Sequence, residues 1–232
     1  MGEKGSWGRL DTRSVAGIAV FSSLAVMLAA VSQSLGLNFP LIPYLQFDLG
    51  EVAIILAFFI FGPVPAFLAS FVEGGALELF GQNLPFGPVL KLFALLSTVA
   101  GLWVGTWVAT RSGGTTLGRA VGSSILAGSA IRAAALTVAN YYLIIFVYTM
   151  AGVGFLKGTF ALFGITMTDA NALALILGFT AVFNVLQLAF VTTLSYLVLR
   201  VRVVSEVRVG GKAPWFTSAL RARGAPDGEK VS

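Results

Sequence analysis

Residues 52–72 read VAIILAFFIFGPVPAFLASFV, and this stretch decides how many times the chain can cross a membrane. Its length and apolar character suit one crossing, because about 20 apolar residues span the hydrocarbon core of a bilayer. Gly62-Pro63-Val64-Pro65 lies in its middle, however, and proline removes a backbone donor and clashes with the preceding helical turn. The stretch therefore forms either one broken span or a tight hairpin of two shorter helices, Asp48–Phe61 and Pro63–Phe80.

Four further segments are long and apolar enough to cross a membrane. Across all 232 residues, 57% are hydrophobic and 11% are charged, whereas an ordinary globular domain carries about 25% charged residues. The apolar excess has to face lipid, which predicts an all-α membrane protein. The four segments are Ser14–Leu35, Leu92–Thr110, one long helix from Ala120 to Leu156, and Ala170–Leu199.

Basic residues gather between these segments in three clusters, which lie within residues 4–13, 111–119 and 200–212. Basic clusters favour the cytoplasmic side of a membrane, so an even number of crossings should separate them. The hairpin satisfies this rule and predicts a six-transmembrane-helix bundle with both termini cytoplasmic. Asp48–Phe61 would be only about 21 Å long, so a re-entrant hairpin satisfies the rule equally well. The expected division is a cytoplasmic N-terminus (1–13), a six-helix transmembrane domain (14–202) and a cytoplasmic, partly disordered tail (203–232).

The sequence offers no catalytic machinery. It contains no cysteine and no histidine, which removes the commonest nucleophile, general base and metal ligands. The nearest approach to a phosphate-binding loop, Gly210-Gly211-Lys212-Ala213, lacks the upstream glycine and the hydroxyl residue that the motif requires. We therefore expect a protein that is not an enzyme, has no metal site or cofactor, and depends on another protein for energy.

Uncharged amides at membrane depth are the candidate binding groups. Asn184 and Gln187 are three residues apart on one face of the last helix, and Asn140 lies in the outer half of the preceding one. They form either interhelical hydrogen bonds, worth about 0.6 kcal/mol each, or a pocket that orients a flat polar ligand.

Ionisable residues within spans are costly and normally face a bundle interior or a cavity. Glu73 lies near mid-span. Several others lie near predicted outer ends, where their side chains can reach the interface, and Arg132, in the inner half of its helix, can reach the cytoplasmic interface. Those near outer ends are Asp48, Glu51, Glu78 and Lys91.

Small residues recur at four-residue spacing in three predicted helices, which lets helix backbones approach closely. The pairs serve either packing within the bundle or docking of another membrane subunit. They are Ala25/Ala29, Gly101/Gly105 and Ser124/Gly128.

Three segments together resemble the substrate-binding (S) components of energy-coupling-factor (ECF) vitamin transporters, in particular the riboflavin type. The segments are Pro43–Val52 followed by Phe61-Gly62-Pro63, Ala139-Asn140-Tyr141-Tyr142 followed by Tyr148, and Phe183-Asn184-Val185-Leu186-Gln187. Ala25-Val26-Met27-Leu28-Ala29 is also similar to that family's A-x-x-x-A face. The resemblance departs from the usual pattern at Gln187, where a lysine is common, and at Glu73, where a basic or amide residue is common.

The resemblance implies capture of riboflavin at the cell membrane, occlusion by the loop Gly36–Phe47, and delivery through a transmembrane coupling subunit and two ABC ATPases. Ala25 and Ala29 would form the docking surface for the coupling subunit. The alternatives are an S component for another vitamin and a structural membrane protein that transports nothing. The implied substrate-binding residues are Gln46, Asp48, Asn140, Tyr141, Asn184 and Gln187.

Overall fold

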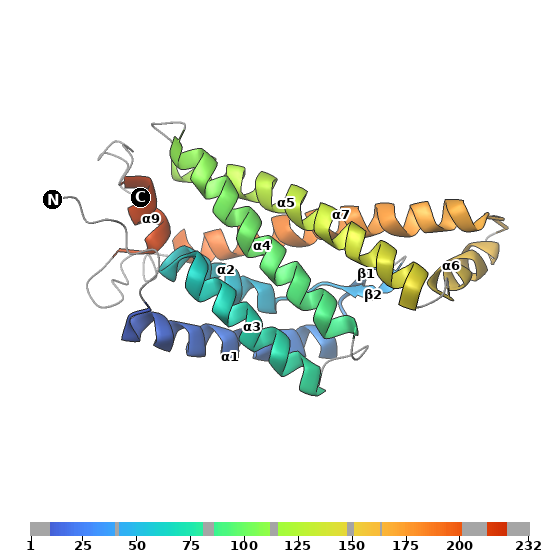
Figure 1. Cartoon of the computed structure of the whole chain (residues 1–232), viewed down its shortest axis with the longest axis horizontal. Coiled ribbons are helices and arrows are strands. Elements are labelled where there is room, and N and C mark those ends of the chain that lie inside the picture. The colour runs from blue at the N-terminus through green and yellow to red at the C-terminus, as the bar shows by residue number, and fades with distance from the viewer. Residues whose placement is uncertain are drawn as a thin grey trace.

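The computed structural model describes residues 10–39, 42–80, 86–111, 116–147, 151–162, 164–200 and 213–221. Helices dominate this part of the chain, and the long ones lie side by side in a bundle (Figure 1). The helices are α1 (Thr12–Ser34), α2 (Gly50–Phe61), α3 (Pro63–Phe80), α4 (Phe86–Arg111), α5 (Leu117–Tyr142), α6 (Ala151–Ala161), α7 (Asp169–Arg200) and α9 (Trp215–Arg221). A π-helix η1 (Leu143–Val147) extends α5, and the strands β1 (Asn38–Phe39) and β2 (Ile42–Gln46) pair antiparallel between α1 and α2.

The stretch that decides the fold is a hairpin and not one broken span. α2 ends at Phe61, Gly62 adopts a φ of +100°, and α3 begins at Pro63. Proline suits the first position of a helix, where its missing N–H has no partner to lose, and glycine suits a positive φ. Among the described residues, four helices are long and apolar enough to cross a membrane, namely α1, α4, α5 with η1, and α7. The chain is thus a helical membrane protein, while the crossing number of six and the cytoplasmic termini stay predictions.

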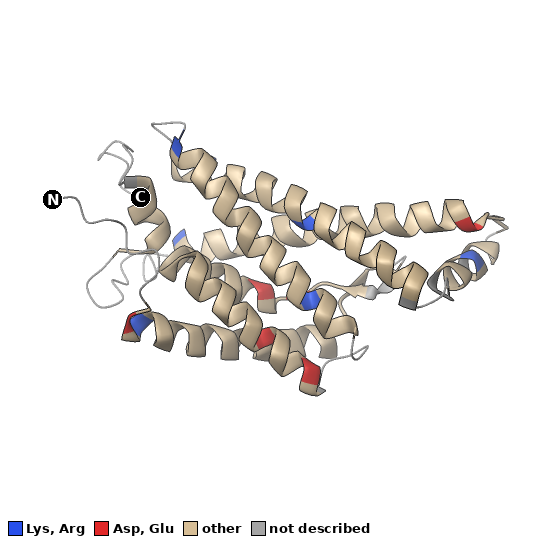
Figure 2. Cartoon of the chain, viewed as in Figure 1, with Lys and Arg blue, Asp and Glu red and all other residues tan. Residues whose placement is uncertain are grey.

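α2 is the innermost helix of the bundle. Its 12 residues are about 18 Å long, and most of them are buried on every side of the helix, including Ile54, Ile55, Phe58 and Phe59. A helix that is apolar all round belongs in a core. α1, α3, α4 and α7 pack around it, and Figure 2 shows long uncharged stretches on these helices, with a few charged residues between them.

The prediction that Ala25 and Ala29 form a docking surface is wrong in this structure. Both side chains are fully buried. A side chain at Gly50, the first residue of α2, would come within 2.5 Å of the Ala25 carbonyl oxygen. The small residues therefore allow α1 to approach α2 closely, which is the packing within the bundle given above as the alternative to docking. The outward face of α1 carries larger side chains such as Val20 and Met27.

The other small residues also pack internally. A side chain added at Gly101 would meet the backbone of Gly128, and one at Gly105 would meet Ser124. At this crossing of α4 and α5 the Ser123 hydroxyl donates to the Gly105 carbonyl oxygen over 3.0 Å. These close backbone contacts fix the position of α5, which carries three residues of the site described below.

The expected long helix from Ala120 to Leu156 is wrong. The α-helix ends at Tyr142, η1 follows, and α6 is a separate helix that packs beside the beginning of α7 (Figure 1). Packing accounts for the separate direction of α6, because Val153 and Leu156 are buried in the same cluster as Ile176 of α7. Tyr148, part of the family resemblance, lies outside the described residues.

Candidate functional site

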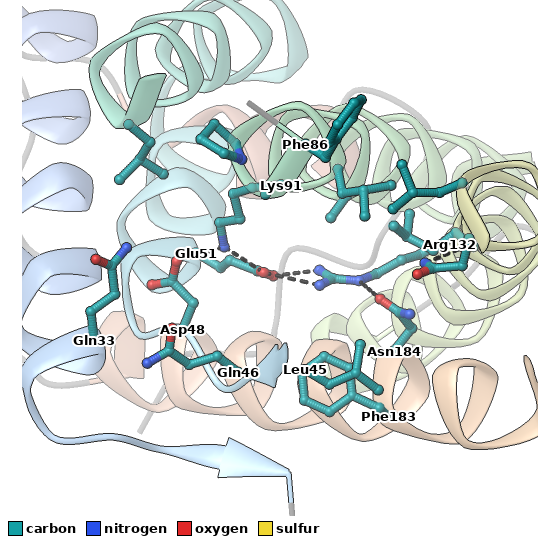
Figure 3. Close-up of a pocket in the computed structure, with 18 of the residues that line it drawn as sticks. Gln33, Leu45, Gln46, Asp48, Glu51, Phe86, Lys91, Arg132, Phe183 and Asn184 are labelled. Carbon is teal, nitrogen blue, oxygen red and sulfur yellow. Dashed lines mark hydrogen bonds and ion pairs between the residues drawn. The ribbon is translucent and has the colours of Figure 1, made fainter. Parts of the chain in front are cut away.

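A cavity of about 430 Å³ lies where α2 begins, bordered by β2 and by helices from both halves of the chain. Its volume is within the range of roughly 300–1,000 Å³ that is typical of small-molecule sites. Figure 3 shows the connected charged side chains crossing the cavity from Lys91 and Glu51 to Arg132, with Phe86 on one side of them and Leu45 and Phe183 on the other. Its lining residues include Gln33, Leu45, Gln46, Asp48, Glu51, Phe86, Lys91, Arg132, Asn140, Phe155, Phe183 and Asn184.

An ion pair between Arg132 of α5 and Glu51 of α2 forms the centre of the row of charged side chains. Arg132 Nη2 donates to Glu51 Oε1 over 2.9 Å, and Nη1 donates to Glu51 Oε2. This two-point arrangement matches the planar guanidinium to the carboxylate and is among the strongest ion-pair geometries. Both side chains are at most 3% exposed, so the pair is shielded from water.

Two further donors of Arg132 are also used. Nη1 donates to the hydroxyl of Thr98 on α4, and Nε donates to Oδ1 of Asn184 on α7, each over 2.9 Å. Asn184 Nδ2 in turn donates to the Thr180 carbonyl oxygen over 2.8 Å. Arg132 therefore holds α2, α4, α5 and α7 together at the cavity, and four of its five N–H donors have partners among the described residues.

Lys91 of α4 extends this network to the loop before α2. Its Nζ lies 2.7 Å from Glu51 Oε1 and 2.8 Å from Asp48 Oδ2. Asp48 Oδ1 accepts the backbone N–H of Gly50, which fixes the start of α2. The four charged side chains that line the cavity thus comprise two cations and two carboxylates in one connected network.

Buried ion pairs contribute little net stability, because removing charges from water offsets most of their attraction. Four ionised side chains in the interior of an apolar bundle are therefore a costly arrangement if their only purpose is folding. Polar residues inside a membrane protein generally mark a ligand or ion pathway. The network and the adjoining cavity together are the candidate functional site.

The loop between α1 and α2 contributes Leu45 and Gln46 to the lining of the cavity. Phe47 and Phe39 pack edge-on against Phe183 of α7, with ring centroids 5.0 and 5.8 Å apart. Leu45 and Phe183 both line the cavity (Figure 3). The segment Gly36–Phe47, which we expected to close over a ligand, therefore forms one wall of the cavity.

Four of the six predicted binding residues line the cavity, namely Gln46, Asp48, Asn140 and Asn184. Gln46 Nε2 donates to the Ser32 carbonyl oxygen over 3.2 Å, which ties β2 to α1. Asn140 is 2% exposed, and its Nδ2 donates to the carbonyl oxygen of Leu136, one turn earlier on α5. Both side chains line the cavity, so each is in a position to contact a ligand.

The other two predicted residues lie elsewhere. Tyr141 is 41% exposed and packs edge-on against Tyr142. Each residue along a helix turns the side chain by about 100°, so Tyr141 points away from the face that Asn140 presents to the cavity. Gln187 is buried, but it does not line the cavity. Its Nε2 donates to the backbone carbonyl oxygen of Asp48 over 2.8 Å, so it supports the loop from behind.

Glu51, Lys91 and Arg132 are site residues that were not among the six predicted ones. The expectation that their side chains extend to the membrane interface is wrong, because they meet in the network inside the bundle. Arg132 is 2% exposed and Glu51 is 1% exposed. One signal was present in the sequence, because Arg132, Leu136 and Asn140 follow each other at four-residue steps and so share one face of α5. All three line the cavity.

Glu73 lies close behind the network without lining the cavity. Its side chain is fully buried, and neither carboxylate oxygen has a hydrogen-bond partner among the described residues. A side chain at Gly50 would come within 2.9 Å of Glu73 Oε1, so the carboxylate lies against the N-terminus of α2. That helix end favours a negative charge.

The fold and the cavity define a helical membrane protein with a cavity of small-molecule size that contains a charged network. No family model matches the chain, and no curated protein matches it. A solved structure described as "Structure and mechanism of the S component of a bacterial ECF transporter" is similar to it, with a TM-score of 0.59 and 19% sequence identity. The match covers 81% of this chain and 94% of that chain. The chain therefore has the fold of an ECF transporter S component.

Proposed function

We propose that this protein is the substrate-binding subunit of a vitamin importer in the cell membrane, and that its substrate is riboflavin. One observation carries the proposal: a cavity of about 430 Å³, lined by a connected polar network and by aromatic rings, within the fold of an S component. The six-helix topology with cytoplasmic termini belongs to this proposal and places the cavity near the outer face.

The network favours an uncharged ligand over an anionic one. Arg132 already donates to Glu51, Thr98 and Asn184. Lys91 is shared between two carboxylates. An anion would have to displace these contacts, at the cost of leaving a buried carboxylate without its partner. A neutral heterocycle can instead use the amides of Gln46 and Asn140 for its polar edge.

Energy has to come from other subunits, because the sequence contains no phosphate-binding loop. The proposal therefore includes a transmembrane coupling subunit and two ABC ATPases as partners. The face of this chain that meets the coupling subunit is not the one containing Ala25 and Ala29, since both are buried. An S component for another vitamin is the alternative within the same class, and a structural membrane protein is the alternative outside it.

Titration of riboflavin with the purified full-length protein tests the proposal, because the fluorescence of a flavin reports its transfer into a protein site. We expect saturable, one-to-one binding, and we expect protein purified from cells to contain a yellow chromophore with a flavin spectrum. Binding of a different vitamin in competition assays would support the S-component class and reject riboflavin. Failure to bind any vitamin would support the structural alternative.

A further inference from the structure

Gln33 is a cavity residue that was not among the six predicted ones. It lies in the last turn of α1, is half-buried, and lines the cavity together with Gln46 and Asp48 from the loop that follows. Figure 3 shows these three side chains toward one end of the row of charged side chains, with Arg132 at the other end. Gln33 thus belongs to the end of the cavity that α1 borders.

The side-chain amide of Gln33 differs from the other polar groups of the cavity, because it has no partner within the described part of the chain. Each of the others makes at least one hydrogen bond or ion pair, and these residues are Gln46, Asp48, Glu51, Lys91, Arg132, Asn140 and Asn184. An amide carries two N–H donors and a carbonyl acceptor. Gln33 therefore offers both kinds of group to a molecule in the cavity without breaking a contact that holds the bundle together.

The backbone beside Gln33 is fixed, although its side chain has no partner. The neighbouring Ser32 is buried, and its hydroxyl accepts the backbone N–H of Leu49 over 2.9 Å. The Ser32 carbonyl oxygen accepts Nε2 of Gln46 over 3.2 Å. Both contacts tie the last turn of α1 to the loop that borders the cavity. A fixed backbone reduces the ordering that a ligand contact requires, so Gln33 is held in place to bind while its amide is unused.

The surroundings of Gln33 favour a neutral ligand group over a charged one. Asp48 lines the same end of the cavity, and Lys91 is already shared between Asp48 and Glu51. An anionic group beside Gln33 would be repelled by the Asp48 carboxylate, and a cationic group would compete with Lys91 for it. A neutral group with a donor next to an acceptor matches the amide at both positions. A ligand without this pattern would displace water from the amide and leave it unpaired.

We propose that Gln33 is a specificity-determining residue that contacts the ligand directly, and that its amide pairs with a neutral ligand group that both donates and accepts a hydrogen bond. This inference rests on the proposed function. Riboflavin contains such groups in two places: the imide edge of its ring system, where an N–H lies between two carbonyls, and the hydroxyls of its ribityl chain. A site that pairs with a polar group discriminates strongly against analogues that lack it.

Replacing Gln33 with leucine removes both kinds of hydrogen-bonding group and keeps a side chain of similar size. We expect full-length Gln33→Leu, purified in detergent, to bind riboflavin about tenfold or more weakly than the wild type in a fluorescence titration. Its unfolding temperature should not fall, since the amide has no partner among the described residues to lose. Gln33→Met, which is unbranched like glutamine, repeats the measurement if the leucine variant does not fold.

Ser34→Ala, on the exposed face of the same helical turn, is the matched control and should leave the affinity unchanged. A Gln33→Leu protein that binds riboflavin as tightly as the wild type does overturns the proposal.

Two riboflavin analogues identify the group that Gln33 contacts. N3-methylriboflavin lacks the N–H of the imide edge, and lumiflavin lacks the ribityl hydroxyls. If Gln33 contacts the imide edge, Gln33→Leu should weaken the binding of lumiflavin about tenfold and that of N3-methylriboflavin hardly at all, and a contact with the chain gives the reverse. An equal loss for riboflavin and both analogues would mean that the substitution acts through packing, and it would reject a direct contact.

The wild-type titration separates the role of Gln33 from the proposed function. If the wild type and Gln33→Leu bind riboflavin equally well, riboflavin binding stands and the role of Gln33 is rejected. If the wild type binds no riboflavin, the proposed function is rejected, and with it a contact between Gln33 and that ligand.

Discussion

The two ends of α2 are held by opposite kinds of interaction. At its beginning, Glu51 is bound by Arg132 and Lys91 within a charged network beside a cavity. At its end, Phe58 and Phe59 pack against the aromatic rings of α9. Burial of the ion pairs at the charged end adds little net stability, because the cost of removing the charges from water offsets most of their attraction. Burial of the rings at the aromatic end stabilises the fold in proportion to the apolar area removed from water. On the proposed function, ligand recognition belongs to the first end, whereas the second end serves the packing of the bundle.

The largest expected effect comes from unbalancing the charged end. Glu51→Gln leaves Arg132 without a carboxylate partner and Lys91 with only Asp48. Removing one partner of a buried pair typically costs about 3–5 kcal/mol, because the other charge stays buried and uncompensated. We expect a loss of that size in the free energy of unfolding, measured by denaturation in detergent, together with a loss of riboflavin binding.

The double variant Glu51→Leu/Arg132→Met is the control for this loss. Replacing a whole buried ion pair with apolar residues is often neutral or stabilising, so we expect stability to return while riboflavin binding stays absent. If the double variant is as unstable as Glu51→Gln, the network is a folding element, and the contrast between the two ends of α2 disappears.

Substitutions at the aromatic end should lower stability without changing riboflavin affinity. Phe59→Ala removes a fully buried ring from the core, and such a change typically costs about 3–5 kcal/mol of stability. Phe216→Ala should cost less, because α9 can undock while the bundle stays folded. In both variants we expect the riboflavin affinity of the folded fraction to be unchanged, since neither ring lines the cavity. A large loss of affinity in Phe216→Ala would show that the two ends are coupled.

The sequence predicted the hairpin because two prolines and a glycine within one apolar run have a local effect on the backbone. It also predicted that Asn140 and Asn184 face a polar site, because amides at membrane depth need partners. It did not predict the network, since Arg132 and Glu51 are 81 positions apart. Local spacing cannot show that charged residues on two helices meet in the interior. The position of α9 was unpredictable for the same reason, because its partners lie on α2.

Asn184 provides a test of ligand recognition at the charged end with a smaller expected effect. Its Oδ1 accepts from Arg132, and its side chain lines the cavity. Asn184→Leu removes this acceptor and leaves a buried donor unpaired, at about 1–3 kcal/mol. Titration of riboflavin should show about five- to a hundred-fold weaker binding. Tyr141→Leu, which changes an exposed side chain outside the cavity, is the control and should bind as the wild type does. Equal affinity for the two variants would place the ligand elsewhere.

The smallest expected effect comes from Gln187, which the sequence alone presents as a ligand contact. In the structure its Nε2 supports the Asp48 backbone carbonyl oxygen, and its Oε1 has no partner among the described residues. Gln187→Leu therefore loses one hydrogen bond but also removes an unpaired buried acceptor, and the two changes partly offset each other.

Because Asp48 borders the cavity, water can replace the lost donor, and we expect riboflavin to bind less than about fivefold more weakly, which corresponds to at most about 1 kcal/mol. The same fluorescence titration measures this change. A loss as large as that of Asn184→Leu would mean that Gln187 contacts the ligand directly and that the loop before α2 moves when the ligand binds. The charged end would then be a site that forms around its ligand, and the aromatic end would be the rigid one.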